Sequence, residues 1–347
     1  MEPRWSCVCC ALPEHLVRYA HAKSGDGNHS SAQQHEATTA ALRSKRHVKR
    51  SAPTQDDCGL RAIYDAGSAK KLPGVLARAE GGRHVRDAVV NDAYRNIGIT
   101  LDFFHKVLGR HSLDGNGIGV KASVHFGTRY PNAMWTGREM LFGDGDGVQI
   151  LGFAHSLDIV GHELTHAVTH HSVRRGLGVV RRNGMVNLEG EAGALNESFS
   201  DVFASMITQW HRKQDVKSAS WLVGEGVLAP HVGRAVRSLK DPGNPRLTYP
   251  EDNQVGGMDG YVEGGDSHVN SGIANRAFYL AARKLGGNSW EQLGAVWYRA
   301  LQMLVHDATF RDAAVACGEA AASLHGVGSP AQRAVLHGWR RVGVLQS

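Results

Sequence analysis

Residues 157–168 read Leu-Asp-Ile-Val-Gly-His-Glu-Leu-Thr-His-Ala-Val and carry the strongest signal in the chain. Apolar residues recur at spacings of three and four from Leu157 to Val168, which predicts a helix with an apolar stripe. His162 and His166 lie one turn apart on another face, so both imidazoles can bind one ion, as H-E-x-x-H zinc sites require. Glu163 stands beside the first histidine and is placed to take a proton from the water that the metal activates. The stretch therefore predicts a hydrolytic zinc site.

A second predicted helix supplies a third ligand. Residues 193–203 read Gly-Ala-Leu-Asn-Glu-Ser-Phe-Ser-Asp-Val-Phe. Glu197 can complete a His₂Glu zinc site, which leaves the fourth position open for water. Asp201, one turn further on, can accept the free imidazole N–H of a ligand and fix its orientation. Without the first motif, both acids would be interpreted as exposed surface residues.

The two sides of the zinc motif differ in periodicity. Residues 85–109 have helical spacing, and short β-like runs follow at 120–126 and 139–142, separated by turn residues. Beyond the motif the pattern is mostly helical almost to the end of the chain. We therefore expect an α+β fold, with a mixed β-rich N-terminal lobe at 58–157 and a helical C-terminal lobe at 158–347.

Residues 22–57 have the composition of a flexible linker. They are poor in large apolar side chains, so they cannot bury enough surface to order themselves. The basic run at 43–50 would suit proteolytic processing, or it is simply a solvated part of the linker. Residues 1–50 hold eight Lys/Arg against four Asp/Glu and so carry most of the net charge of +6. The rest of the chain is nearly balanced, which argues against nucleic-acid binding. No apolar run is long enough to span a membrane.

The cysteines do not predict a disulfide framework, because three of the five crowd the first ten residues and the total is odd. Cys7, Cys9 and Cys10 could bind a metal, but their spacing matches no common zinc pattern, and free thiols are the alternative. The apolar stretch after Arg4 is interrupted at residues 13–15 by Pro, Glu and His, unlike a secretory signal. The sequence therefore does not establish an export route.

Together, the two predicted helices resemble the signature of the thermolysin-like peptidases, also called the neutral metalloproteinase family. Further segments resemble that family in the same order along the chain. Residues 132–135, Asn-Ala-Met-Trp, resemble its substrate-binding edge strand, in which the backbone at Ala133 and the side chain of Asn132 would hold the peptide. Arg237 matches the arginine that grips a substrate carbonyl near the scissile bond, and His268 matches the catalytic histidine.

The resemblance implies a two-lobed zinc-dependent endopeptidase with the metal site between its lobes. His268 and Arg237 would stabilise the oxyanion of the tetrahedral intermediate. A carboxylate should orient His268; Glu263 precedes it by five residues and Asp266 by two, and the family position favours Glu263. The resemblance also implies peptide or protein substrates, a monomer and secretion, with a cytoplasmic location as the alternative.

The start of the chain extends the resemblance. Residues 10–19 resemble the opening of the short propeptides of the protealysin-like branch, with the paired prolines of that branch reduced to Pro13. We interpret residues 1–21 as a propeptide-like segment that can inhibit its own enzyme, in a chain made as a proenzyme. A short amphipathic helix without an inhibitory role is the alternative.

Three features depart from the family pattern. The stretch between the two predicted helices is longer than usual around residues 172–182, and this insertion should lie near the active-site cleft. Leu188 stands where the family often has a tyrosine that donates to the oxyanion. The acidic calcium cluster of thermolysin is mostly missing, so Ca²⁺ binding stays open. At the expected calcium positions the chain has Asp158 and Glu225, but also Thr208, Ser220 and Leu222.

Two other functions stay open at this point. Leu188 and the insertion would also suit a catalytically weakened zinc-binding or protein-interaction module on the same fold. A zinc aminopeptidase would share the His₂Glu chemistry, but it needs an acidic anchor for the substrate amine, and no motif here supplies one.

Overall fold

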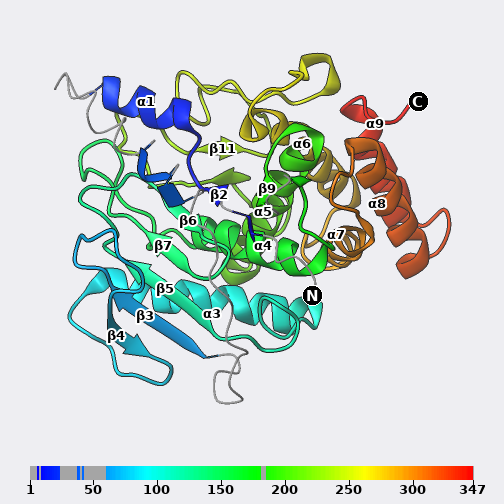
Figure 1. Cartoon of the computed structure of the whole chain (residues 1–347). Coiled ribbons are helices and arrows are strands. Elements are labelled where there is room, and N and C mark those ends of the chain that lie inside the picture. The colour runs from blue at the N-terminus through cyan, green and yellow to red at the C-terminus, as the bar shows by residue number, and fades with distance from the viewer. Residues whose placement is uncertain are drawn as a thin grey trace.

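The computed structural model describes residues 6–7, 9–23, 37–39, 41–42, 60–180 and 185–346 of the chain. It confirms the α+β architecture, because a β-containing N-terminal lobe precedes a helical C-terminal lobe (Figure 1). The basic run at 43–50 and most of the predicted linker lie outside the described residues, as do the side chains of Cys7 and Cys9.

The N-terminal lobe is built on a mixed sheet with strand order β2-β6-β7-β5-β3-β4. In that order the strands are Cys9–Cys10, Ala133–Trp135, Met140–Phe142, Val120–Val124, Arg61–Asp65 and Val75–Ala79. Helix α3 (Ala88–Leu108) packs on this sheet and begins after Asp87, whose carboxylate accepts hydrogen bonds from the N–H groups of Val89 and Val90. Strand β6, the predicted substrate-binding segment, lies antiparallel to both β7 and β2.

Helix α4 (Leu157–Ser172) carries the H-E-x-x-H motif through the middle of the molecule. Every residue from 157 to 169 is buried, because α4 packs against α3, against β6 and against α5 (Gly190–Arg212). Gly161 allows the close approach of α5, since a Cβ at this position would lie 3.0 Å from Ile207 Cδ1 and 3.5 Å from the Cα of Ala204. A helix buried in this way leaves its polar side chains no water, so they must find partners inside the protein.

The rest of the helical lobe surrounds α5. Its helices are α6 (Ser267–Leu285), α7 (Gln292–Met303), α8 (Phe310–His325) and α9 (Pro330–Arg341). Helix α6 packs between α5 and α9, and α7 packs on α8. Between α5 and α6 the chain forms the antiparallel pair β10 (Leu222–Val223) and β11 (Arg237–Ser238), and then the 3-10 turn η2 (Met258–Gly260).

The N-terminal segment lies between two strand edges. Its first strand, β1 (Ser6–Cys7), pairs in parallel with β9 (Met185–Asn187), which in turn pairs antiparallel with β8 (Val179–Val180). Its second strand, β2, pairs antiparallel with β6. Helix α1 (Glu14–Ala22) follows and buries its apolar face. In Figure 1 this blue segment runs from α1 toward the green helices α4 and α5. Both β1 and β2 contact α4.

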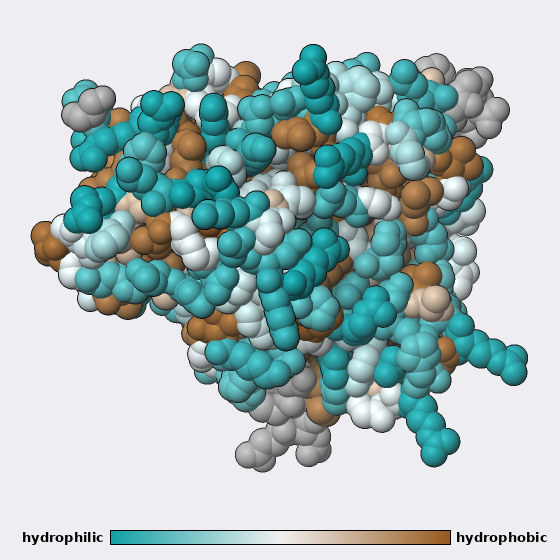
Figure 2. Space-filling view, turned by 180° about the vertical axis from the view of Figure 1, so that it is seen from behind, coloured by the Kyte–Doolittle hydropathy of each residue, from teal (hydrophilic) through white to brown (hydrophobic). Residues whose placement is uncertain are grey.

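Both lobes share one large apolar core, which extends from Ile63 in β3 to Trp339 in α9. On the face opposite to that of Figure 1, hydrophilic residues cover most of the surface and hydrophobic residues form separate groups (Figure 2). Of the helices in the described part of the chain, none is both long and apolar enough to cross a membrane.

Candidate active site

Helices α4 and α5 bring the three predicted metal ligands together. The Nε2 atoms of His162 and His166 lie 3.0 Å apart. Oε2 of Glu197 lies 3.3 Å from the first of these nitrogens and 3.8 Å from the second. All three side chains are buried. Within the described residues, this is the one group of three or more His, Cys, Asp or Glu side chains whose ligand atoms are close enough to hold a metal ion.

Hydrogen bonds at the far side of each imidazole fix its orientation. Nδ1 of His162 donates to Oδ1 of Asp201 at 2.8 Å, and Nδ1 of His166 donates to Oδ1 of Asn196 at 2.9 Å. Each Nε2 therefore turns a lone pair toward the other and toward Glu197. Neither carboxylate oxygen of Glu197 has a hydrogen-bond partner among the described residues. Buried lone pairs that face one another need a cation between them, so this donor set fits Zn²⁺.

Asp201 joins the metal site to the predicted substrate-binding arginine. Its two oxygens accept hydrogen bonds from Nη2 and Nε of Arg237, both at 2.8 Å, and Oδ2 also accepts from Nδ2 of Asn275 at 2.9 Å. Burial alone would raise the pKa of Asp201, but Arg237 and His162 hold it well below its usual range. The carboxylate is therefore ionised and orients both the imidazole and the guanidinium. Asn275 was missed in the sequence, although it follows His268 by two helical turns and so shares its face of α6.

Glu163 is held by the edge strand. The N–H of Trp135 in β6 donates to Oε2 of Glu163 at 2.8 Å, whereas Oε1 has no hydrogen-bond partner in the described part of the chain. Burial raises the pKa of Glu163 to about 8. One carboxylate oxygen is thus anchored and the other is free to exchange a proton. No pattern in the sequence indicates this use of the Trp135 backbone.

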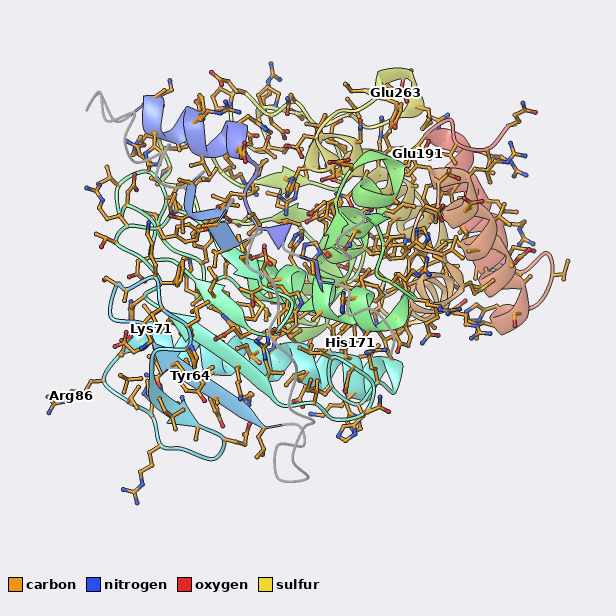
Figure 3. The ribbon with its side chains drawn as sticks, viewed as in Figure 1. Tyr64, Lys71, Arg86, His171, Glu191 and Glu263 are labelled. Atoms are coloured by element: carbon orange, nitrogen blue, oxygen red, sulfur yellow. The ribbon has the colours of Figure 1, made fainter. Side chains whose placement is uncertain are left out.

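The prediction that Glu263 orients His268 is wrong. Nδ1 of His268 lies 3.0 Å from Oδ1 of Asp266, and the same oxygen accepts the N–H of His268 at 2.9 Å as the N-cap of α6. Glu263 is exposed on the outer loop at the top of Figure 3. A turn closed by the Gly265 N–H and the Val262 carbonyl directs this loop outward, so the residue nearest the helix start takes the contact.

The N-terminal segment engages the residues predicted to bind substrate. The carbonyl of Cys10 accepts from Nε2 of His268 at 3.0 Å, and the carbonyl of Ala11 accepts from Nη1 of Arg237 at 2.9 Å. The N–H of Ala11 donates to the carbonyl of Ala133 at 3.1 Å.

The side chain of Asn132 completes these contacts. Its Oδ1 accepts the N–H of Leu12 at 3.0 Å, and its Nδ2 donates to the carbonyl of Leu12 at 3.1 Å. Since Nε2 of His268 lies 3.3 Å from Oε2 of Glu197, the peptide bond between Cys10 and Ala11 lies directly beside the predicted metal site.

The insertion expected around residues 172–182 overlaps strand β8, which pairs with β9. Leu188 follows β9 half-buried and has no hydroxyl group. At the expected calcium position, Asp158 accepts hydrogen bonds from Ser156, from the N–H of Ile159 and from the N–H of Gly224. Protein donors thus satisfy this carboxylate, and calcium binding stays a prediction.

A His₂Glu donor set supplies the three protein ligands of a catalytic zinc ion, and an adjacent glutamate with a free oxygen is the base that hydrolysis needs. The fold and site therefore define a zinc metallopeptidase. Two family models match the chain: "Thermolysin metallopeptidase, catalytic domain" at residues 26–170 and "Thermolysin metallopeptidase, alpha-helical domain" at residues 185–344. The chain belongs to the thermolysin metallopeptidase family and is a zinc-dependent endopeptidase.

Relatives place the chain in the protealysin-like part of the family. It is 39% identical to the "Extracellular metalloprotease" of Pectobacterium carotovorum subsp. carotovorum, over 85% of this chain and 84% of that protein. It is 35% identical to the thermolysin of Alicyclobacillus acidocaldarius subsp. acidocaldarius, over 81% of this chain but 50% of that protein. The solved structure of the precursor of protealysin, a metalloproteinase from Serratia proteamaculans, matches with a TM-score of 0.81 and 37% identity, over 97% of this chain and 100% of that one.

Proposed function

We propose that the chain is an endopeptidase precursor in which His162, His166 and Glu197 bind the zinc ion and the N-terminal segment blocks the substrate-binding residues. The observation that carries the zinc assignment is the buried Glu197 carboxylate, which faces two imidazole nitrogens and has no hydrogen-bond donor among the described residues. The precursor assignment is supported by the contacts of Cys10, Ala11 and Leu12 and by the similarity to a solved precursor.

Different residues of this chain have different roles in peptide hydrolysis. When bound, Zn²⁺ supplies a Lewis acid that polarises the scissile carbonyl and acidifies a water molecule. Glu163 accepts the proton of the attacking water on its free oxygen and passes it to the leaving amine. Nε2 of His268 donates to the carbonyl that becomes the oxyanion, as it does to Cys10 here. Arg237, held by Asp201, positions the next carbonyl of the substrate, as it does with Ala11.

The N-terminal segment acts as an intramolecular inhibitor in this proposal. It uses the hydrogen-bonding groups that a substrate would use, and its effective concentration is high because it belongs to the same chain. Processing within the linker at 22–57, for which the basic run at 43–50 is suited, would allow it to leave. We expect the processed enzyme to be monomeric and to cleave peptide and protein substrates.

An endopeptidase suits the geometry better than an aminopeptidase. The segment does not end at Cys10 but continues away from the metal site through β2 to β1. An aminopeptidase would close this side with an acidic anchor for the substrate amine, whereas here the chain passes through. A catalytically weakened module is the second candidate, since Leu188 supplies no hydroxyl to the oxyanion.

One substitution separates these functions. We expect Glu163→Gln to abolish cleavage of an N-terminally blocked peptide while zinc, measured by mass spectrometry, stays near one ion per chain. Glu319→Gln, exposed on α8 and outside the site, should change neither value. If zinc-loaded natural protein, cut in the linker after folding, binds zinc but cleaves no peptide, the weakened module is the correct function.

The names of the relatives also support a location. The relative from Pectobacterium is called an extracellular metalloprotease, and we propose that this protein is secreted, with the cytoplasm as the alternative. Detection of the protein in culture medium and in cell lysate, beside a cytoplasmic marker, distinguishes the two.

A further inference from the structure

The inserted hairpin provides a second strand edge beside the active site. β8 and β9 pair antiparallel, with Val179 opposite Asn187. The other edge of β9 pairs in parallel with the N-terminal segment, with Ser6 opposite Met185 and Cys7 opposite Val186. The segment therefore contacts two edges, first β9 of the insertion and then β6 of the N-terminal lobe.

The base of this hairpin is attached to the metal site. Nδ2 of Asn196 donates to the carbonyl of Leu177 at 2.7 Å, while Oδ1 of the same side chain accepts from Nδ1 of His166. The N–H of Gly178 donates to the carbonyl of His306 at 2.7 Å. Leu177 is fully buried. The hairpin therefore begins at a point that is fixed relative to a metal ligand.

Its other end is also held. A Cβ at Gly193 would lie 2.3 Å from the carbonyl carbon of Leu188, so the backbone that leaves β9 rests directly on α5. Only glycine at position 193 allows this approach. Because both ends of the hairpin are fixed against α5, the helix that carries Glu197, β9 has a defined position relative to the scissile bond.

The N-terminal segment gives the register of a bound substrate. His268 and Arg237 hold the carbonyls on the two sides of the bond between Cys10 and Ala11. Counted back from that bond, the first and second residues pair with β6, and the fourth and fifth residues, Cys7 and Ser6, pair with β9. A peptide that binds in the same direction would place its own fourth and fifth residues on β9.

We propose that β9 is a second substrate-binding edge, which binds the backbone of the fourth and fifth residues before the cleaved bond after the N-terminal segment has left. This inference rests on the proposed function. Strand pairing uses backbone N–H and C=O groups, so β9 selects extended peptides by length and not by side chain. Its ligand is an unstructured polypeptide with at least five residues before the cleaved bond.

The test compares kcat/KM for the cleavage of blocked peptides by the natural chain loaded with Zn²⁺. A protease site introduced into the linker allows the chain to be cut there after it has folded. The peptides share the cleaved bond and have three or five residues before it. We expect the longer peptide to have about ten-fold higher kcat/KM, since each added backbone hydrogen bond contributes about two- to ten-fold. Methylating the amide nitrogen at one of the two outer residues should cancel this gain and methylation at its neighbour should not, because successive N–H groups of a strand point to opposite sides.

A variant tests the protein side of the pairing. Replacing residues 179–187 by a short Gly-Ser linker should remove the gain with length and leave the kcat/KM of the three-residue peptide within about two-fold. If that variant does not fold, the methylated peptides decide alone. Equal kcat/KM for short and long peptides overturns the role of β9 and leaves the endopeptidase intact. Cleavage of neither peptide overturns both.

Discussion

Replacing Asp266 by asparagine is expected to lower kcat/KM about two- to thirty-fold, whereas replacing Glu263 by glutamine should leave it unchanged. Oδ1 of Asp266 accepts two hydrogen bonds, from Nδ1 of His268 at 3.0 Å and from its backbone N–H at 2.9 Å. Asparagine keeps an acceptor oxygen and caps a helix as well as aspartate does. The substitution therefore removes the charge and little else.

The magnitude follows from that charge. Burial alone would raise the pKa of Asp266, but the His268 imidazole and both hydrogen bonds hold it well below its usual range, so the carboxylate is ionised. A hydrogen bond to a charged group contributes about 1.5–3 kcal/mol and a neutral one about 1 kcal/mol. The difference of about 0.5–2 kcal/mol acts on the rate, because the negative charge of Asp266 stabilises the protonated His268 imidazole, whose Nε2 donates to the oxyanion.

The assay measures kcat and KM for a blocked peptide with zinc-loaded protein cut at a protease site introduced into the linker, so that maturation does not depend on the activity under test. Zinc content and thermal unfolding are measured on the same samples. We expect kcat to fall more than KM rises, with unfolding temperature and zinc content close to those of the natural protein. Equal activity of Asp266→Asn and the natural enzyme, or a comparable loss in Glu263→Gln, would refute the reasoning.

Three further predictions concern other contacts. Asn132→Ala removes two hydrogen bonds to the backbone of Leu12; we expect about ten-fold higher KM for peptides in the processed enzyme, and an unchanged KM would contradict the substrate role. Chelation of zinc should abolish cleavage and lower the unfolding temperature, with both restored by added Zn²⁺; an unchanged unfolding temperature would exclude the buried site. Burial opposes protonation of His125, but the carboxylates of Asp144 and Asp87 raise its pKa above 6.5. The contribution of His125 to stability is therefore complete below pH 6.5 and is lost as the pH rises through the raised pKa. Between pH 5.5 and 9 the unfolding temperature should decline less in His125→Gln than in the natural protein. Parallel profiles of the two proteins would exclude this contribution of His125.

The sequence by itself determined the metal-binding face. In an α-helix, residues four apart share a face, whatever surrounds the helix, so the spacing of His162 and His166 predicts one ligand pair. The same rule relates Glu197 to Asp201. Local rules also determined where α3 begins, because Asp87 can satisfy the first free N–H groups of the helix without help from the rest of the chain.

Only the tertiary structure decided the contacts that cross long sequence separations. The path of the loop before α6 determined that Asp266, and not Glu263, meets His268. Asn275 reaches Asp201 because α6 packs on α5. No spacing of residues along the chain predicts these side-chain contacts.

The same holds for the N-terminal segment and the insertion. A sequence comparison suggested a propeptide-like start, but the contact of Ala11 with Arg237 joins residues 226 positions apart. The pairing of β1 with β9 needs a hairpin whose two ends are fixed on α5. Helical periodicity depends on neighbours within one or two turns, so the sequence reveals it. Strand pairing and side-chain contacts across the molecule depend on how whole elements pack, so only the folded chain reveals them.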